Sequence, residues 1–220
     1  MTNEQIFKRI DHTILSPVTT AEQVKKVCEE AIKYNMASAC IPPNYVSAMK
    51  QAFPSLSICT VIGFPLGYSK SKANETELAI ADGADEVDIV INLADVKNKQ
   101  YEHIETELKH IRKISEGKIL KVIIETCYLT EEEKIMLCKI VTECKADYIK
   151  TSTGFGTSGA NIEDIHLFKE QIGENVKIKA SGGIRTKEQF EAFINLGCDR
   201  LGASSAIQAL LGENTEKNLY

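Results

Sequence analysis

Apolar residues recur along this chain in two spacings that alternate from one end to the other. In segments such as 21–34 they return every three or four residues, as at Val24, Val27 and Cys28, which predicts an amphipathic helix with one buried face. In shorter segments such as 37–41 the apolar residues are nearly continuous, which predicts a strand that is buried on both faces. The alternation of the two patterns indicates an α/β protein with a mostly parallel sheet.

Eight strand–helix pairs follow one another without a change of composition that would mark a domain boundary. The expected strands span 10–15, 37–41, 57–63, 86–92, 119–125, 147–151, 176–180 and 198–202. The expected helices span 21–34, 44–52, 70–82, 96–115, 130–144, 161–171, 186–195 and a short segment from about 205. Eight units can close, so we predict a single-domain (β/α)8 TIM barrel over residues 1–220 rather than an open doubly wound sheet. The polar segment 212–220 predicts a short mobile tail.

Charge and hydropathy exclude several classes of protein. The 220 residues carry 26 basic and 31 acidic side chains, a formal net charge of −5, so no broad positive field is available to hold a nucleic acid. No apolar run approaches the roughly 18 residues of a membrane span. Residues 1–10 lack the apolar stretch of a signal peptide. We therefore expect a cytoplasmic protein with neither a membrane nor a nucleic acid as its partner.

The cysteine and histidine spacings indicate neither disulfides nor a metal. The seven cysteines include no C-x-x-C pair, and most lie in apolar segments, which is typical of reduced thiols in a reducing compartment. The four histidines form no H-E-x-x-H motif and no other zinc spacing. We expect no metal site.

Charged residues interrupt several strands that should otherwise be apolar, and three of them share a chemical pattern. In the fourth expected strand, Asp88 lies on the face opposite Val87 and Ile89, because side chains alternate along a strand. Helices must cover the apolar face, so Asp88 points into the barrel, where an unpaired carboxylate would be strongly destabilising. Lys150 and Lys179 occupy interior positions on two neighbouring strands in the same way.

Two interior lysines beside one carboxylate favour a chemical role over a structural one. A buried Lys–Asp pair that only holds the barrel together remains an alternative for Asp88. Two ammonium groups about 5 Å apart repel each other by roughly 3 kcal/mol at an effective dielectric constant near 20. That repulsion lowers the pKa of one lysine by about two units. A neutral lysine attacks carbonyl groups and forms a Schiff base.

Two loops rich in glycine and serine follow the last two strands. Residues 181–185 read SGGIR and residues 202–206 read GASSA, and in many barrels the loops at these places bind phosphate through backbone N–H groups and hydroxyls. The candidate phosphate-binding residues are Gly182, Gly183, Gly202, Ser204 and Ser205. The alternative is that the glycines only form tight turns and that a serine caps a helix.

Residues 154–159, GFGTSG, match the dinucleotide-binding pattern G-x-G-x-x-G, but their context argues against such a site. That fingerprint belongs after a first strand and requires an acidic residue about 20 positions later, where this chain reads KIKASGG. We therefore expect no nicotinamide cofactor, and no cofactor of another kind. We interpret these glycines as residues that let the loop approach a sugar or a phosphate beside Lys150.

These segments resemble the deoxyribose-phosphate aldolase family, whose members are class I aldolases on a (β/α)8 barrel. The resemblance covers nearly the whole chain and rests on IDHTIL at 10–15, VIGFPLG at 61–67, GADEVDIVIN at 83–92, KVIIET at 121–126, DYIKTSTGFGTSGA at 147–160 and KASGGIR at 179–185. It implies reversible cleavage of 2-deoxy-D-ribose 5-phosphate to D-glyceraldehyde 3-phosphate and acetaldehyde, through a lysine Schiff base and without a metal. The partners that it implies are a sugar phosphate and aldehydes.

The same resemblance implies roles for individual residues. Lys150 in YIKTSTG is similar to the Schiff-base lysine, and Lys179 in KIKASGG is similar to its activating neighbour. Asp88 resembles the carboxylate that moves protons together with Lys179 and a water molecule. The glycines and serines of the two loops named above resemble the phosphate-binding residues. Asp11 and Thr13 resemble residues near the sugar hydroxyls.

Two more positions resemble residues that act in some members of the family. Tyr220 is similar to a C-terminal tyrosine that reaches into the site to assist proton transfer, and a tail without function is the alternative. Cys40 resembles a thiol that meets reactive aldehydes in some members, and we interpret it here as an inert buried thiol. The lysine-rich segment 67–77 departs from the family pattern.

Two other functions stay open at this point. One is a barrel isomerase or lyase for another sugar phosphate, with Asp88 as the base, Lys179 as the electrophile and no covalent step. The other is a sugar-phosphate-binding protein that has lost its chemistry, which would be marked by replacement of either lysine or of Asp88. The residues do not decide the oligomeric state, although a homodimer is compatible with them.

Overall fold

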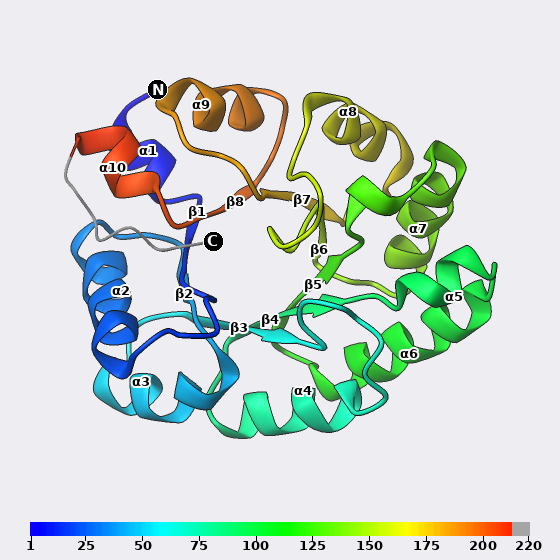
Figure 1. Ribbon diagram of the computed structural model, residues 1–220, viewed down its shortest axis with the longest axis horizontal. Helices are drawn as coiled ribbons and strands as arrows, with labels where there is room; N and C mark the ends of the chain where they lie inside the picture. Colours follow the sequence, from blue (N-terminus) through cyan, green and yellow to red (C-terminus); the bar gives the residue numbers. More distant parts are fainter. Residues whose placement is uncertain (213–220) are drawn as a thin grey trace.

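Eight parallel strands pair in the order of the sequence, and the last one pairs with the first, so that the sheet closes into a barrel. The computed structural model describes residues 1–212. The strands are β1 (Ile10–Thr13), β2 (Ser38–Cys40), β3 (Ile58–Ile62), β4 (Glu86–Val90), β5 (Ile119–Ile123), β6 (Tyr148–Lys150), β7 (Lys177–Ser181) and β8 (Arg200–Ala203). Figure 1 looks into the barrel and confirms the predicted (β/α)8 architecture.

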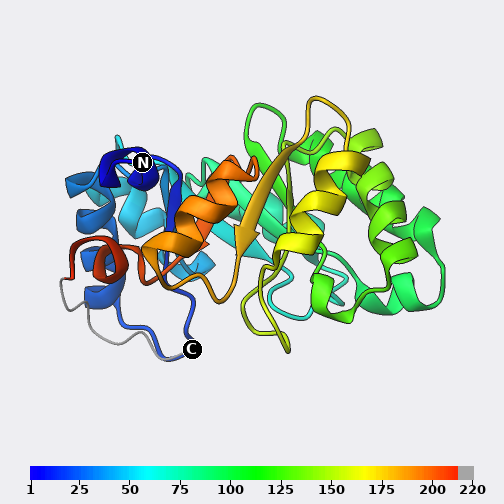
Figure 2. The same ribbon diagram turned by 90° about the horizontal axis from the view of Figure 1, so that it is seen from above.

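Helices form a ring around the strands (Figure 1). The α-helices are α1 (Asn3–Phe7), α2 (Ala21–Lys33), α3 (Val46–Ala52), α4 (Lys72–Ala81), α5 (Leu93–Lys97), α6 (Tyr101–Ile114), α7 (Glu131–Glu143), α8 (Ile162–Gln171), α9 (Lys187–Asn195) and α10 (Ala206–Leu211). Two short 3₁₀ helices, η1 (Pro43–Tyr45) and η2 (Thr126–Tyr128), lie after β2 and β5. Because all strands are parallel, their carboxyl ends lie at one end of the barrel. In Figure 2 the gold arrowhead of β7 points to that end.

Local hydrogen bonds fix where several of these helices begin. At the start of α2 the Thr20 hydroxyl accepts from the backbone N–H of Gln23, while the Gln23 side chain accepts from the Thr20 N–H at 2.9 Å. The same reciprocal capping box begins α7 and α9. Each box satisfies two backbone donors that the first turn of a helix leaves without a partner.

The structure corrects two details of the predicted elements. The segment 96–115 is not one helix, because α5 ends at Lys97 and α6 begins at Tyr101. Lys99 adopts a left-handed φ of 56° that an α-helix cannot contain, and the spacing of apolar residues carries no sign of this short turn. The helix α1 was not predicted, since a helix of five residues is too short to show a period.

The two faces of the strands carry different kinds of side chain. Apolar side chains such as Val87, Ile89 and Val122 are buried in the core cluster that the strands share with the surrounding helices. The alternate positions point into the barrel and carry most of its buried charges, which we describe below. Bulky branched residues usually fill the interior of such a barrel. Buried charges in their place identify the interior as the candidate site.

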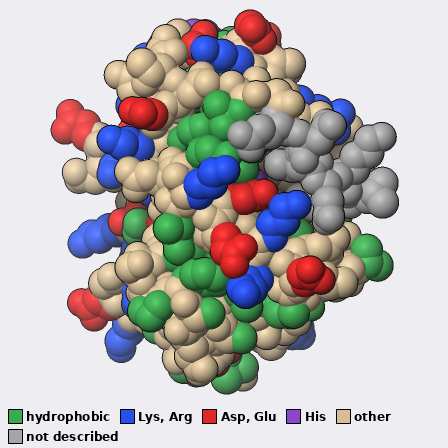
Figure 3. Space-filling view, turned by 90° about the vertical axis from the view of Figure 1, so that its left-hand side faces the viewer, with side chains coloured by type: hydrophobic (Ala, Val, Ile, Leu, Met, Phe, Trp, Pro, Cys, Tyr) green, Lys and Arg blue, Asp and Glu red, His purple; other side chains and the backbone are tan. Residues whose placement is uncertain are grey.

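The outer surface carries charges of both signs. Figure 3 shows basic and acidic side chains interleaved on the face that it presents. Among residues 1–212 no helix is both long enough and apolar enough to cross a membrane.

Candidate active site

The structure brings Asp88, Lys150 and Lys179 together inside the barrel. Lys150 Nζ donates a hydrogen bond to Asp88 Oδ2 at 2.7 Å, and Lys179 Nζ donates to the same oxygen at 2.7 Å. The two nitrogens are therefore separated by no more than twice that distance. Lys150 is 3% exposed and Lys179 is fully buried, so neither amine is turned outward into solvent. The predicted proximity of the two interior lysines is present in the structure.

Four more charged residues extend this group. Lys121 Nζ on β5 lies 2.8 Å from Asp88 Oδ1 and 2.6 Å from Glu86 Oε2. Arg200 pairs with Glu86 at 3.0 Å and also with Asp11, which in turn pairs with Lys179. We call these residues the charged cluster: Asp11, Glu86, Asp88, Lys121, Lys150, Lys179 and Arg200. It joins four basic side chains to three carboxylates in one network.

Within the cluster, ion pairs outweigh the effect of burial on several pKa values. Burial alone would raise the pKa of Asp88, but Lys121, Lys150 and Lys179 hold it well below its usual range. Burial opposes the charge of Lys179, yet Asp11 and Asp88 raise its pKa. Burial likewise opposes the charge of Lys121, whose pKa Asp88 and its neighbours raise well above the usual value. Asp88 is thus a carboxylate at neutral pH, and Lys121 and Lys179 are ammonium groups.

Sequence reasoning missed Lys121, Glu86 and Arg200, although the alternation along the strands contains the signal for them. Lys121 stands between Leu120 and Val122, which are buried in the outer core. Glu86 lies two residues before Asp88 and therefore shares its face of β4. The rule that placed Asp88 inside the barrel applies equally to these positions.

Asp11 and Thr13 both come from β1, but their surroundings differ. The Asp11 carboxylate is fully buried, accepts from the Ser38 hydroxyl at 2.7 Å and belongs to the charged cluster. Thr13 is half-buried, and its hydroxyl donates to the Asp11 carbonyl at 2.8 Å. The contact of these two residues with sugar hydroxyls stays a prediction.

The two candidate phosphate-binding loops meet after β7 and β8. Gly182 and Gly183 both have left-handed φ values, 86° and 76°, which favour glycine. The Ser205 hydroxyl donates to the Ile184 carbonyl at 2.9 Å and joins the two loops, while Ser204 beside it is half-buried. Gly202 lies within β8, where a Cβ atom would come 3.3 Å from Lys179 Cε. Close packing against Lys179 therefore explains why residue 202 is a glycine. Phosphate binding by the residues of these two loops stays a prediction.

The glycine-rich loop at 154–159 packs against the first of these loops. A Cβ atom at Gly159 would lie 2.1 Å from the carbonyl oxygen of Gly182, so only glycine allows this approach. The Ala160 N–H continues the contact by donating to the Ser181 carbonyl at 3.0 Å. Close packing of two loops thus accounts for a glycine of the G-x-G-x-x-G pattern.

Glu125, which sequence reasoning did not single out, holds the segment that follows Lys150. It lies just after β5 with a left-handed φ of 53°, and its carboxylate is buried. It accepts hydrogen bonds from the Thr153 backbone N–H at 3.1 Å and from the Thr153 hydroxyl. Burial raises the pKa of Glu125 against the opposing effects of these bonds and of Lys150. The bonds fix the start of the glycine-rich loop relative to Lys150.

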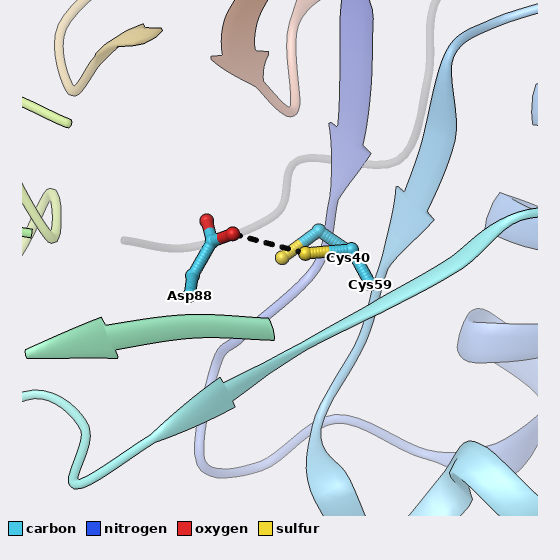
Figure 4. A group of neighbouring side chains, drawn as sticks. All are labelled: Cys40, Cys59 and Asp88. Atoms are coloured by element: carbon cyan, nitrogen blue, oxygen red, sulfur yellow. Dashed lines mark hydrogen bonds between the residues drawn. The ribbon is translucent and has the colours of Figure 1, made fainter. Parts of the chain in front are cut away.

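An uncharged region lies beside the charged cluster. We call it the thiol wall; it consists of Leu15, Cys40, Cys59 and Val61, with Phe64 packed on them. Cys59 Sγ donates to Asp88 Oδ1 at 3.2 Å, so the wall contacts the cluster directly (Figure 4). Cys40, Cys59 and Asp88 are close enough to share an ion, but three lysines already neutralise Asp88 and oppose a bound cation. The expectation of no metal site stays a prediction.

The predictions on the cysteines and on the C-terminal tail have different outcomes. All seven cysteines are free, and six of them are buried, which agrees with reduced thiols. Tyr220 lies outside the described residues, as does all of the predicted tail beyond Gly212.

Comparison with known proteins yields close matches over nearly the whole chain. Residues 6–212 match the family described as DeoC/LacD family aldolase. The deoxyribose-phosphate aldolase of Clostridium botulinum (strain Alaska E43 / Type E3) is 58% identical over 219 residues, covering 98% of this chain and 99% of that protein. The deoxyribose-phosphate aldolase of Clostridioides difficile (strain 630) is 52% identical over 215 residues, covering 96% of this chain and 98% of that protein.

Solved structures of aldolases share the fold. The structure of QR15, described as an aldolase, superposes with a TM-score of 0.89 at 37% identity and covers 93% of this chain and 94% of that one. A deoxyribose phosphate aldolase from Aeropyrum pernix, described as a unique tetramer, has a TM-score of 0.85 at 30% identity, covering 95% of this chain and 91% of that one.

Proposed function

Because the chain belongs to the DeoC/LacD family of aldolases and acts as a deoxyribose-phosphate aldolase, we propose that it works as a class I enzyme through a Schiff base on Lys150. The observation that carries this proposal is the composition of the charged cluster. Within the charged cluster four basic side chains share three carboxylates, so the cluster carries one excess positive charge when all four basic side chains are protonated. Loss of one proton from a lysine balances the cluster.

Lys150 is the member of the cluster that is best placed to lose that proton. Among residues 1–212 it pairs with Asp88 alone, whereas Lys179 also pairs with Asp11, and Lys121 contacts Asp88, Asp11 and Glu86. It is also the least buried of the three lysines, at 3% exposure against 0% for Lys121 and Lys179. A neutral amine at Lys150 can still donate a hydrogen bond to Asp88 while its lone pair attacks an aldehyde.

The steps of the reaction follow from which groups of the cluster carry a proton. The Lys150 amine adds to C1 of the open-chain sugar, and the resulting carbinolamine loses water when its hydroxyl receives a proton. Lys179 supplies that proton through Asp88, since both lysines contact the same oxygen of Asp88. The iminium accepts the electron pair of the C2–C3 bond while Asp88 takes the proton of the C3 hydroxyl, so the bond breaks to give an enamine on Lys150 and a three-carbon aldehyde. Protonation and hydrolysis of the enamine release acetaldehyde and restore Lys150.

Gly182, Gly183, Ser204 and Ser205 are proposed to hold the substrate phosphate. Support comes from the bond between Ser205 and Ile184, which brings the two loops together at the carboxyl ends of β7 and β8. Backbone N–H groups in left-handed glycine segments form concave sites for anions. A role for Tyr220 in proton transfer and a cytoplasmic location of the enzyme are part of the same proposal.

Borohydride trapping tests the covalent step. With acetaldehyde and borohydride, the full chain should gain an ethyl group in place of one hydrogen, and peptide mapping should locate it on Lys150. Lys150→Arg should lose both the adduct and the activity. Lys177→Arg, which changes an exposed lysine on β7, is the matched control and should keep both. Full activity in Lys150→Arg, or the absence of an adduct in the active parent, would instead favour a non-covalent mechanism with Asp88 as the base.

A further inference from the structure

We propose that Cys40 and Cys59 form a site of reversible oxidation, at which a small peroxide links the two thiols as a disulfide and lowers the activity of the enzyme. This inference goes beyond the aldolase reaction, which uses neither thiol as a reactant, and it replaces the interpretation of Cys40 as an inert thiol. It rests on the placement of two buried cysteines on adjacent strands, beside the carboxylate that contacts Lys150.

The strand register places the two residues within disulfide geometry. Cys40 and Cys59 are directly paired across β2 and β3, so their side chains leave the sheet on the same face. Neighbouring strands are about 4.8 Å apart, which lies within the roughly 4.4–6.8 Å between Cα atoms in disulfides. The two sulfur atoms and an Asp88 carboxylate oxygen all lie within 4.8 Å of one another. Figure 4 shows both sulfurs turned toward Asp88.

The two thiols have unequal reactivity, which assigns the order of steps. The neighbouring Cys59 side chain lowers the pKa of Cys40, and Lys179 and Lys150 act in the same direction, while burial and Asp88 oppose them. Burial raises the pKa of Cys59. Burial also raises the pKa of Cys28, Cys138 and Cys198 to about 12. Cys40 is therefore the thiol that loses its proton more readily and reacts with the oxidant first.

The chemistry balances with hydrogen peroxide as the oxidant. The Cys40 thiolate attacks one peroxide oxygen, the O–O bond breaks, and the hydroxide that leaves takes up a proton to form water. The Cys59 sulfur then attacks the Cys40 sulfenic acid, the S–O bond breaks, and the second hydroxide leaves as water with the Cys59 proton. Acetaldehyde must enter the barrel to reach Lys150. Because hydrogen peroxide is smaller than acetaldehyde, it can enter by the same route.

Disulfide formation changes the surroundings of Asp88. Cys59 Sγ donates to Asp88 Oδ1 at 3.2 Å and lies 3.3 Å from Lys121 Nζ. A sulfur in a disulfide has no proton to donate, and it must move to about 2.05 Å from its partner sulfur. Asp88 thus loses a donor while the thiol wall shifts, and we expect the activity to fall about tenfold.

Peroxide titration of the reduced full chain tests this inference. The expected product has lost two hydrogens, shows a Cys40–Cys59 link in a non-reducing peptide map, has about tenfold lower activity, and recovers with dithiothreitol. Cys40→Ser and Cys59→Ser should not form the link, and each should stay within about twofold of its own reduced activity after peroxide. Cys127→Ser is the matched control, because Cys127 is the one cysteine that is not buried. It should still form the link and lose activity.

Several results would overturn the inference. One is oxidation of Cys40 to a sulfinic acid without a link, and another is a link that uses a different cysteine. A third is the Cys40–Cys59 link with unchanged activity. Borohydride trapping of reduced Cys40→Ser with acetaldehyde separates this inference from the Schiff-base proposal, since the adduct on Lys150 does not depend on the link.

Discussion

The charged cluster and the thiol wall occupy the same barrel interior, but one consists of charged side chains and the other of uncharged ones. The cluster draws side chains from β1, β4, β5, β6, β7 and β8, and its members are held by paired charges. The thiol wall draws Cys40, Cys59 and Val61 from β2 and β3, and none of them carries a formal charge as a thiol or an alkyl group. The two regions meet where Cys59 contacts Asp88 and Lys121.

This contrast separates two tasks within one site. Paired charges fix where protons reside, because each carboxylate or ammonium group changes the protonation of its neighbours. An uncharged wall shapes the space beside Lys150 without changing the balance of charge. Substitutions in the charged cluster should therefore alter pH dependence or stability, and substitutions in the thiol wall should leave the pH profile in place.

Removing the negative charge of Asp11 from the charged cluster should have the largest effect of the changes considered, and the effect should be a loss of stability. Asp11→Asn leaves Lys179 and Arg200 without a carboxylate that they share, which we expect to lower the free energy of unfolding at pH 7 by about 3–5 kcal/mol. The ion pairs lower the pKa of Asp11, so its stabilisation is present above the unfolded value of about 3.9 and is lost as pH falls below it.

Urea unfolding of the parent and of Asp11→Asn at a series of pH values measures this difference. The gap between the two proteins should narrow as the pH falls below about 4. Glu29→Gln provides the comparison, because Glu29 pairs with Lys25 at 3.7 Å on an exposed helix face and should change stability little. A gap for Asp11→Asn that is no larger than for Glu29→Gln would remove the structural role assigned to the cluster.

Lys179→Leu should have the next largest effect, on the pH dependence of activity. Removal of the ammonium group takes away roughly 3 kcal/mol of repulsion at about 5 Å and an effective dielectric constant near 20. Protonation of Lys150 becomes easier, so the pH profile should move about two units to higher pH. The activity at pH 7 should fall about a hundredfold from this shift, and further because Lys179 no longer supplies a proton. The pH profile of kcat/KM measures the shift. An unmoved profile would contradict the account of how Lys150 is activated.

Alternation along the strands predicted Asp88 and Lys179, which stand between apolar neighbours that face the helices, and Lys150, which follows the apolar Ile149. The barrel followed from eight repeated units, and its closure is confirmed. The sequence did not reveal which oxygen of Asp88 each lysine contacts, or that Cys40 lies beside Cys59. Both depend on the register between neighbouring strands, which closure of the whole barrel sets. The break at Lys99 depends on a single backbone angle and leaves no periodic signal.

Lys121→Met should shift the pH profile in the same direction as Lys179→Leu, but by less. Lys121 contacts Oδ1 of Asp88, whereas Lys150 contacts Oδ2, so its charge acts on Lys150 from the other side of the carboxylate. We expect about a tenfold loss at pH 7 and partial recovery at higher pH. Thermal unfolding shows whether the variant is folded at the assay temperature. A shift as large as that of Lys179→Leu would mean that the two cations act on Lys150 equally.

Cys59→Ala tests the contact between the two regions and should have the smallest effect. The change removes a weak S–H donor at 3.2 Å from Asp88, while Lys121, Lys150 and Lys179 still bind that carboxylate. We expect kcat to fall about threefold at most, with no movement of the pH profile. Val61→Ala is the matched control, because it alters the same wall without removing a donor. A moved profile in Cys59→Ala alone would show that a thiol helps to place the protons, and the division between the charged cluster and the thiol wall would then fail at Cys59.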